Sequence, residues 1–405
     1  MILRIGITNS ELSWGNAMNY NRYLNMDLPK GQSAFLWGAR KTGKSTYLHA
    51  NFPGSAYFNL LKTDLYNRYL KQPYLFREEI LALPKEALDC PIIIDEIQKI
   101  PLLLNEVHYL IEDIGAQFIL CGSSARKLKR GAANLLGGRA WGYTFYPLTF
   151  QEIPDFDLLR ALNQGLIPTH YMSAQYHRFL KAYIHDYLIE EIQAEGLVRN
   201  LPAFSRFLEA QAFSHGQLVN FSNIARDCAI DSKTVKEYYQ ILVDTLLGYF
   251  IYPYHKKTSR DLISATPKFY LFDVGVANAL TKQHIDSLKG IWAGQSFEHY
   301  ILMELMAYRG LNDLDFEILF WRTKTGLEVD FILGNGDVAI EVKISSSVHQ
   351  SELKGLCAFV ESYKPRLAIV VSQDPRPRRL QHGAQSILIL PWRDFLTRLW
   401  AKEII

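Results

Sequence analysis

The sequence lacks paired cysteines and long apolar runs, two features that would assign it to a class at once. Its four cysteines, Cys90, Cys121, Cys228 and Cys357, lie far apart and form no CxxC pair, which favours buried, reduced thiols in a reducing compartment. No window approaches the roughly 18 apolar residues of a spanning helix, and the N-terminal apolar run is too short for a signal peptide. We therefore expect a cytoplasmic protein without membrane contact.

An excess of one charge is also absent, because the formal net charge is only +3. No global field therefore commits the chain to nucleic acid, and a binding surface must come from local clustering of charge. The chain has 405 residues, 48% of them hydrophobic and 21% charged. These values are typical of a folded protein of two or three domains.

One short stretch near the N-terminus has the spacing GxxxxGK[ST]. It reads FLWGARKTGKSTYL over residues 35–48, between a predicted strand (SAFLW) and a predicted helix (STYLHANF). In that context the pattern predicts a phosphate-binding loop rather than a lysine-rich turn. The lysine would reach the phosphates and the serine would offer its hydroxyl to Mg²⁺. The predicted nucleotide contacts from this loop are Gly38, Ala39, Arg40, Lys41, Thr42, Gly43, Lys44, Ser45 and Thr46.

Two further strands are predicted to end at the same place. CPIIIDE (residues 90–96) places Asp95 and Glu96 at the carboxyl end of a buried strand, where ligands gather in open α/β sheets. Asp95 would hold Mg²⁺ and Glu96 would polarise the attacking water; a solvated strand end is the alternative. The strand QFILC is followed by Ser123 and Ser124, either of which could touch the γ-phosphate or the water.

Basic residues follow these serines, and one of them could be an arginine finger supplied to a neighbouring nucleotide. Arg139, in the glycine-rich LLGGRAWGY, is the preferred candidate, and Arg126 is the second. A phosphate-backbone contact and a solvated helix are the alternatives. A finger acting in trans would require a homo-oligomer.

Taken together, several motifs resemble a prokaryotic family that joins an AAA-type ATPase domain to a C-terminal domain of poorly defined role. They are GARKTGKST, IIIDEIQKIP, CGSSARKL, LLGGRAWGYTFYPLTFQE and EVDFIL…AIEVK. The resemblance covers most of the chain. It implies ATP binding and a nuclease-like C-terminal fold.

The middle of the chain is predicted to be helical. Residues 173–195 have the periodicity of one long amphipathic helix, and residues 218–244 predict a helix-turn-helix with a cap at Asp231–Ser232. LGYFIYPY and KFYLFDVG would be the wing strands. With Lys233 and Lys236 on the second helix, this winged helix predicts DNA binding; a rigid spacer or protein dock is weighed equally.

A second group of chemically distinctive residues lies on a hairpin near the C-terminus. Asp330 precedes the turn GNGD, and Glu341 and Lys343 follow it on one strand face. The pattern resembles the PD-(D/E)XK nuclease core, although Val329 replaces the proline. The resemblance implies that Asp330, Glu341 and Glu298 bind Mg²⁺ or Mn²⁺ and that Lys343 activates water. Glu328 is expected to be a surface charge.

The sequence thus predicts an α/β multidomain protein. Its parts would be an AAA-type P-loop domain with a parallel sheet (1–155), a helical linker with a winged helix (156–285) and a restriction-endonuclease-like α/β domain (286–405). The predicted function is ATP hydrolysis coupled to DNA binding or processing. The alternative is a nucleotide-gated switch whose degenerate nuclease-like domain only binds a protein partner.

Overall fold

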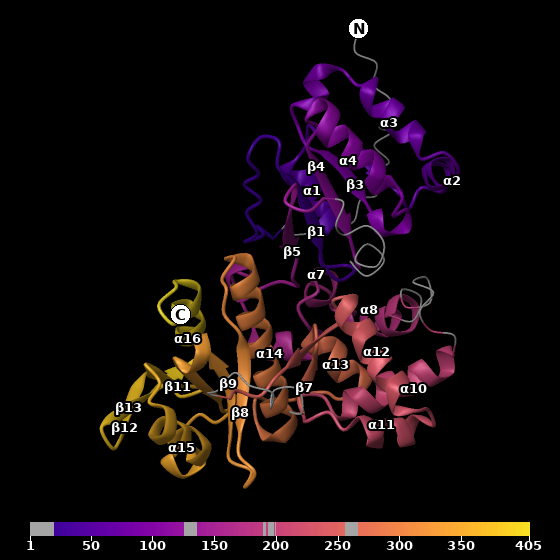
Figure 1. The fold of residues 1–405 in the computed structure, drawn as a ribbon. Helices are drawn as coiled ribbons and strands as arrows, with labels where there is room; N and C mark the ends of the chain where they lie inside the picture. Colours follow the sequence, from indigo (N-terminus) through magenta and orange to yellow (C-terminus); the bar gives the residue numbers. More distant parts are fainter. Residues whose placement is uncertain (1–19, 125–135, 189–191, 193–197, 199, 256–265) are drawn as a thin grey trace.

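Three units are visible in the computed structural model, which describes residues 20–124, 136–188, 192, 198, 200–255 and 266–405 (Figure 1). The N-terminal unit lies at the top of the figure, the middle unit at the lower right and the C-terminal unit at the lower left. Within the described residues, no helix has both the length and the apolar character needed to cross a membrane.

The N-terminal unit is built on a five-stranded parallel sheet of order β2-β3-β4-β1-β5. Its strands are β1 (Ser33–Trp37), β2 (Tyr57–Asn59), β3 (Ile92–Asp95), β4 (Phe118–Gly122) and β5 (Ala140–Thr144). Its helices are α1 (Lys44–Asn51), α2 (Thr63–Lys71), α3 (Tyr74–Leu81) and α4 (Leu103–Ile114).

Apolar runs form the central strands of this sheet because both of its faces are covered. Alternate residues of β3 belong to different cores: Ile92 and Ile94 pack on one side, and Ile93 packs on the other. Because parallel strands share one direction, their carboxyl ends meet at one edge of the sheet. That edge carries the predicted phosphate loop and the DE pair.

The middle unit is mainly helical, as predicted. Its elements are α6 (Leu158–Gln164), α7 (Pro168–Tyr171), α8 (Tyr176–Ala182), a π-helix η4 (Tyr183–Leu188), α10 (Leu201–Phe213), α11 (Phe221–Cys228), α12 (Ser232–Asp244), the strands β6 (Gly248–Ile251) and β7 (Lys268–Leu271), and α13 (Val274–Leu280). Residues 189–191 and 193–197 of the single helix predicted over 173–195 lie outside the described residues; in the described part a helix runs from Tyr176 to Leu188 and changes from α to π at Tyr183. That tyrosine is buried against the rings of His170 and Phe272, so tertiary packing decides the helix geometry there.

Two consecutive helices, α11 and α12, occupy the segment predicted as a helix-turn-helix. Asn220 and Asp231 cap the two helices through their side chains, which accept from the amides of Asn223 and Thr234. β6 and β7, predicted as wing strands, pair as an antiparallel hairpin after α12.

The C-terminal unit contains a six-stranded mixed sheet of order β12-β13-β11-β10-β9-β8. Its elements are α14 (Gly290–Leu311), β8 (Ile318–Arg322), β9 (Glu328–Leu333), β10 (Val338–Val342), α15 (Lys354–Tyr363), β11 (Leu367–Ser372), β12 (Arg378–His382), β13 (Gln385–Pro391) and α16 (Trp392–Trp400). The hairpin predicted around GNGD joins β9 to β10.

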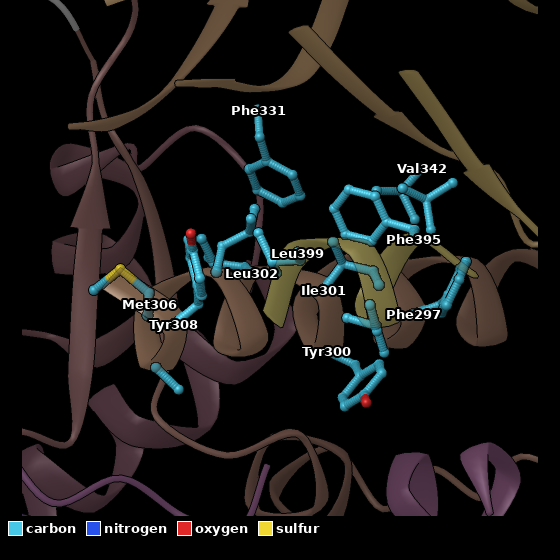
Figure 2. Packing of buried hydrophobic residues seen from close by; sticks show 14 of the residues in the cluster. Phe297, Tyr300, Ile301, Leu302, Met306, Tyr308, Phe331, Val342, Phe395 and Leu399 are labelled. Atoms are coloured by element: carbon cyan, nitrogen blue, oxygen red, sulfur yellow. The ribbon is translucent and has the colours of Figure 1, made fainter. Parts of the chain in front are cut away.

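The long helix α14 connects all three units. It begins at Gly290, before the predicted start at Ser296, and most of its side chains are buried. Figure 2 shows its residues Phe297, Ile301 and Leu302 among side chains of the C-terminal sheet and α16. The same core cluster includes Leu148 and Phe156, which follow the N-terminal sheet. Rotation of α14 would therefore disturb packing in more than one unit.

Candidate functional site

The loop between β1 and α1 has the backbone of an anion site. Gly43 lies in the left-handed region (φ 102°) as the N-cap of α1, and that cap carries no side-chain hydrogen bond. An uncapped helix amino end presents amide donors and a partial positive charge. A Cβ at Gly38 would lie 2.3 Å from the carbonyl oxygen of Phe145. Glycine is therefore required at position 38 for β5 to approach the loop.

Lys44, Ser45 and Asp95 meet at this edge. The hydroxyl of Ser45 donates to Asp95 Oδ2 over 2.9 Å, and the hydroxyl of Tyr57 donates to the same oxygen over 2.6 Å. Burial and the Asp95 carboxylate raise the pKa of Tyr57, so the tyrosine stays a neutral donor. Lys44 is buried, and its ammonium donates to the carbonyls of Gly38 and Ala39. In this arrangement the ammonium lies inside the loop.

Glu96 is positioned beside Asp95 by an unusual backbone. It adopts φ 63°, which turns its side chain away from the strand direction. Gln98 donates to Glu96 Oε2 over 2.5 Å and to the hydroxyl of Ser123 over 3.1 Å. Gln98 thus links the two strand ends that the sequence placed together. Sequence reasoning missed Gln98, whose only signal was its place two residues after Glu96. The other predicted serine, Ser124, is buried next to Ser123.

Arg139 does not lie at this edge within the chain. It precedes β5 and its guanidinium pairs with Glu112. Ala140 is in register with Ser33, at the amino end of β1, whereas the phosphate loop follows Trp37. The length of β1, about 13 Å, separates the two positions. Arg126 lies outside the described residues.

Sequence reasoning also missed Arg22, whose side chain contacts the backbone of the phosphate loop. Its guanidinium donates to the carbonyl of Thr42 (2.7 Å), to the carbonyl of Tyr146 (2.7 Å) and to Glu152 Oε1 (2.9 Å). It also lies over the ring of Phe145, with 4.1 Å between guanidinium carbon and ring centroid. The signal was weak, a single arginine in NYNRYL.

The middle unit contacts the other side of the same loop. Ala39 packs in the core cluster of that unit, and the hydroxyl of Tyr183 donates to the carbonyl of Arg40 over 3.4 Å. His170 is close enough to Lys41 that burial and then the lysine lower its pKa to about 4. The phosphate loop is therefore in contact with the π-helix, so a change in the shape of the loop would be felt in the middle unit.

The hairpin of the C-terminal unit brings its three predicted residues together. Ile340 is in register with Phe331, which places Glu341 opposite Asp330 on one face. Lys343 Nζ lies 2.5 Å from Glu341 Oε1, and Asp330 Oδ2 accepts from the amide of Val342 over 2.7 Å. Burial raises the pKa of both carboxyl groups, and the pKa of Asp330 is further raised by Glu341.

Glu298 and Glu328 face a lysine that sequence reasoning did not select. Lys268, the first residue of β7, lies with its ammonium 2.5 Å from Glu328 Oε1 and 3.4 Å from Glu298 Oε1. Tyr270 also donates to Glu298, over 2.5 Å. The expectation that Glu328 is a surface charge is therefore wrong. Glu328 and Asp330 are two positions apart on β9, so they share a face.

The two predicted magnesium sites differ in how well their residues fit an ion. At the phosphate loop, Ser45 and Asp95 offer a hydroxyl and a carboxylate, the hard oxygen donors that Mg²⁺ prefers. In the C-terminal cluster, lysine ammonium groups lie against Glu298, Glu328 and Glu341. No cluster of three or more His, Cys, Asp or Glu side chains in the described ranges could hold a metal ion. The C-terminal residues thus do not fit a metal centre.

Comparison with known proteins matches each unit to a different family model. Residues 157–287 match a domain of unknown function (DUF8612), and residues 293–395 match another (DUF4143). No curated protein matches the chain.

Two matching solved structures are distant. One is the ORC1 protein of Aeropyrum pernix in complex with DNA, at 13% identity, with 62% of this chain and 87% of that chain covered and a TM-score of 0.24. The other is a signal-transduction ATPase with numerous domains (STAND) and a tetratricopeptide repeat sensor from Pyrococcus horikoshii. It shows 12% identity and a TM-score of 0.21, and the match covers 69% of this chain and 44% of that chain.

The N-terminal unit is the part that a named family identifies. Residues 30–154 match the model of an AAA domain, and they contain the sheet, the phosphate loop and the DE pair described above. This part of the chain is an AAA-type P-loop domain.

Proposed function

We propose that this chain binds ATP with Mg²⁺ at the P-loop, hydrolyses it, and passes the nucleotide state to the middle and C-terminal units. The contact that carries the proposal is the 2.9 Å hydrogen bond from Ser45 to Asp95. It joins the P-loop to the carboxyl end of β3 beside an uncapped helix amino end. Oxygen donors next to amide donors suit a metal–triphosphate ligand.

Each residue at this edge has a role in the proposed reaction. The amides of the loop and the ammonium of Lys44 would bind the phosphates, and Ser45 and Asp95 would hold Mg²⁺, which neutralises charge on them. Lys44 would leave its bonds to Gly38 and Ala39 to do so. Glu96 would orient the attacking water and take its proton, with Gln98 fixing the carboxylate.

A change in the P-loop on nucleotide binding would reach the other units through two sets of contacts. One set runs from Arg40 and Ala39 to the π-helix of the middle unit. The other runs from Thr42 through Arg22 to Glu152. Residues 149–152 continue to α14, because Glu304 accepts from the amide of Phe150 over 2.8 Å. A ligand that reshapes the loop would bias both sets, as a population shift requires.

Nucleotide binding and phosphate release by the full chain test this proposal. Wild type should bind a fluorescent ATP analogue with Mg²⁺ and release phosphate. Lys44→Ala should lose binding, whereas Glu96→Gln should keep binding and lose hydrolysis by about 10²-fold or more. Equal phosphate release by wild type and Glu96→Gln would contradict the assignment of Glu96, and unchanged binding in Lys44→Ala would contradict the site.

DNA binding through the helix-turn-helix is a second function that one observation favours. A surface hollow of about 510 Å³ opens between the starts of α11 and α12. Its lining is mixed: the apolar residues Leu218, Val219 and Phe221 lie beside the polar residues Asn220, Ser222, Ser232, Lys236 and Thr266. Hydroxyl, amide and ammonium donors at helix amino ends suit a phosphate backbone. A protein partner or a second copy of this chain would use the same face without the salt dependence of DNA binding.

A further inference from the structure

The carboxylate cluster of the C-terminal unit contains a cation that comes from another unit. Lys268 starts β7 of the middle unit, and its side chain is only 5% exposed. Its ammonium bridges Glu328 (2.5 Å) and Glu298 (3.4 Å) and lies 5.4 Å from the ring centroid of Phe320. Glu298 is on α14 and Glu328 is on β9, so a single lysine joins three elements.

Most carboxylate groups around this lysine are already paired. Glu298 also accepts from Tyr270, and the second oxygen of Glu328 pairs with Arg322 over 2.9 Å. Glu341 pairs with Lys343 through one oxygen, and its buried second oxygen has no hydrogen-bond partner among the described residues.

A buried ammonium in this position opposes a divalent ion. Like charges in a buried site repel strongly, because the surroundings screen them less than water does. A divalent ion bound by Asp330 and Glu341 would lie beside the ammonium of Lys343, which pairs with Glu341, and in the same group of charges as Lys268. Withdrawal of Lys268 would in turn leave Glu298 with only the hydroxyl of Tyr270 and Glu328 with only Arg322 at the rim of the cluster, which is unfavourable for partly buried carboxylates.

We propose that Lys268 is the resident cation of this cluster, in place of a divalent metal ion. The lysine neutralises the acidic face of the hairpin. Its ion pairs with Glu298 and Glu328 also hold the middle unit against the C-terminal unit. The wild-type cluster therefore takes up no Mg²⁺ or Mn²⁺, and it gains a divalent-cation site when Lys268 loses its charge. The C-terminal unit is then a nuclease-like fold used as a junction, which agrees with the switch alternative and excludes metal-dependent cleavage by this site.

Mn²⁺ titration of the full chain without nucleotide, followed by electron paramagnetic resonance, tests the proposal. The variants are Lys268→Met, Asp330→Asn, the double variant, and Lys354→Met as a control at an exposed lysine of α15. Lys268→Met should bind one additional Mn²⁺ at least about tenfold more tightly than wild type. The double variant should lose that ion, and Lys354→Met should match wild type.

Two results would overturn the proposal: wild-type Mn²⁺ binding that Asp330→Asn abolishes, or a folded Lys268→Met that binds no more Mn²⁺ than wild type. If Lys268→Met does not fold, the comparison of Mn²⁺ binding between wild type and Asp330→Asn tests the proposal by itself. Equal Mn²⁺ binding by those two proteins supports a resident lysine, and loss in Asp330→Asn overturns it. Because Mn²⁺ bound near Ser45 and Asp95 is insensitive to Asp330, failure here is distinguishable from failure of the ATPase proposal.

Discussion

Arg22 and Glu152 are separated by 130 positions in the chain, yet their side chains form a 2.9 Å ion pair directly behind the P-loop. Both side chains are almost fully buried, at 9% and 1% exposure. Glu152 also accepts from the amides of Tyr23 and Thr149. Its carboxylate therefore holds both the segment that precedes β1 and the segment that follows β5. The shape of the P-loop and the entry into the middle unit are thus held by one pair of charges.

Removal of the Arg22 guanidinium should weaken both stability and nucleotide binding. Arg22→Met leaves a buried carboxylate without its cation, a change that costs about 3–5 kcal/mol. We expect a lower melting temperature by calorimetry and a raised Kd for ATP. The double variant with Glu152→Gln should recover part of the stability but not the affinity, because Thr42 still lacks its donor. Full recovery of ATP affinity would show that Arg22 does not shape the loop.

Gln98 should act on catalysis through Glu96 and not on binding. Gln98→Ala removes the amide that holds the Glu96 carboxylate and contacts Ser123. We expect kcat to fall by about 10-fold or more, with KM for ATP little changed, because the phosphate contacts remain. Gln98→Glu, which keeps the size but places a second acid beside Glu96, should be at least as slow. A change in KM alone would contradict the positioning role.

Glu304 should make stability depend on pH near neutrality. It accepts from Trp400 Nε1 and from the amide of Phe150, but burial outweighs these bonds and raises its pKa from 4.5 to about 7. An acid with a raised folded-state pKa stabilises the fold while it is protonated. Its contribution is therefore lost as pH rises from about 4.5 to about 7. The slope is about 1.4 kcal/mol per pH unit at most, or roughly 3 kcal/mol in all.

Comparison of wild type with Glu304→Gln isolates this effect. His299 works in the opposite direction, because burial lowers its pKa to about 4 and its neutral form becomes more stabilising as pH rises to about 6.5. Melting temperatures at pH 5 to 8 should therefore be compared as a difference. Relative to wild type, Glu304→Gln should gain stability between pH 5 and 7 and stay level above that range. A difference independent of pH would contradict a protonated Glu304.

DNA affinity, if the helix-turn-helix binds DNA, should depend on salt through α12. Lys233→Ala and Lys236→Ala should each weaken binding to duplex DNA at low salt and lower the slope of log K against log salt by about 1. Lys71→Ala, at an exposed lysine on α2, should leave both values unchanged. Fluorescence anisotropy over a series of salt concentrations gives the slopes. Equal slopes in all four proteins would exclude α12 as the DNA surface.

Local pattern was sufficient to predict three strands of the N-terminal sheet and the edge at which they end, but not β2 or β5. The strands β1, β3 and β4 and the helix α1 lie where apolar runs and glycine positions predicted them. Ser45 and Asp95 meet because parallel strands bring their carboxyl ends to one edge, a consequence of topology class alone. The helix cap at Asp231 was likewise a local prediction and was confirmed. In the C-terminal unit, the period of two along the hairpin placed Asp330 and Glu341 on one face.

Only the tertiary structure decided which distant side chains pair with the residues at the P-loop edge and in the C-terminal carboxylate cluster. Arg22, Lys268 and Glu304 gave little or no local signal, because an isolated charged residue has the same sequence pattern whether it is solvated or buried. Their roles arise from pairing with Glu152, Glu328 and Phe150 across long sequence separations. The π-helix that begins at Tyr183 was also not predicted; the buried ring of Tyr183 packs there against the ring of His170. The sequence by itself determined the P-loop, the strands that end beside it and the carboxylate–lysine hairpin, whereas the charges that hold the units together were decided by how the units pack.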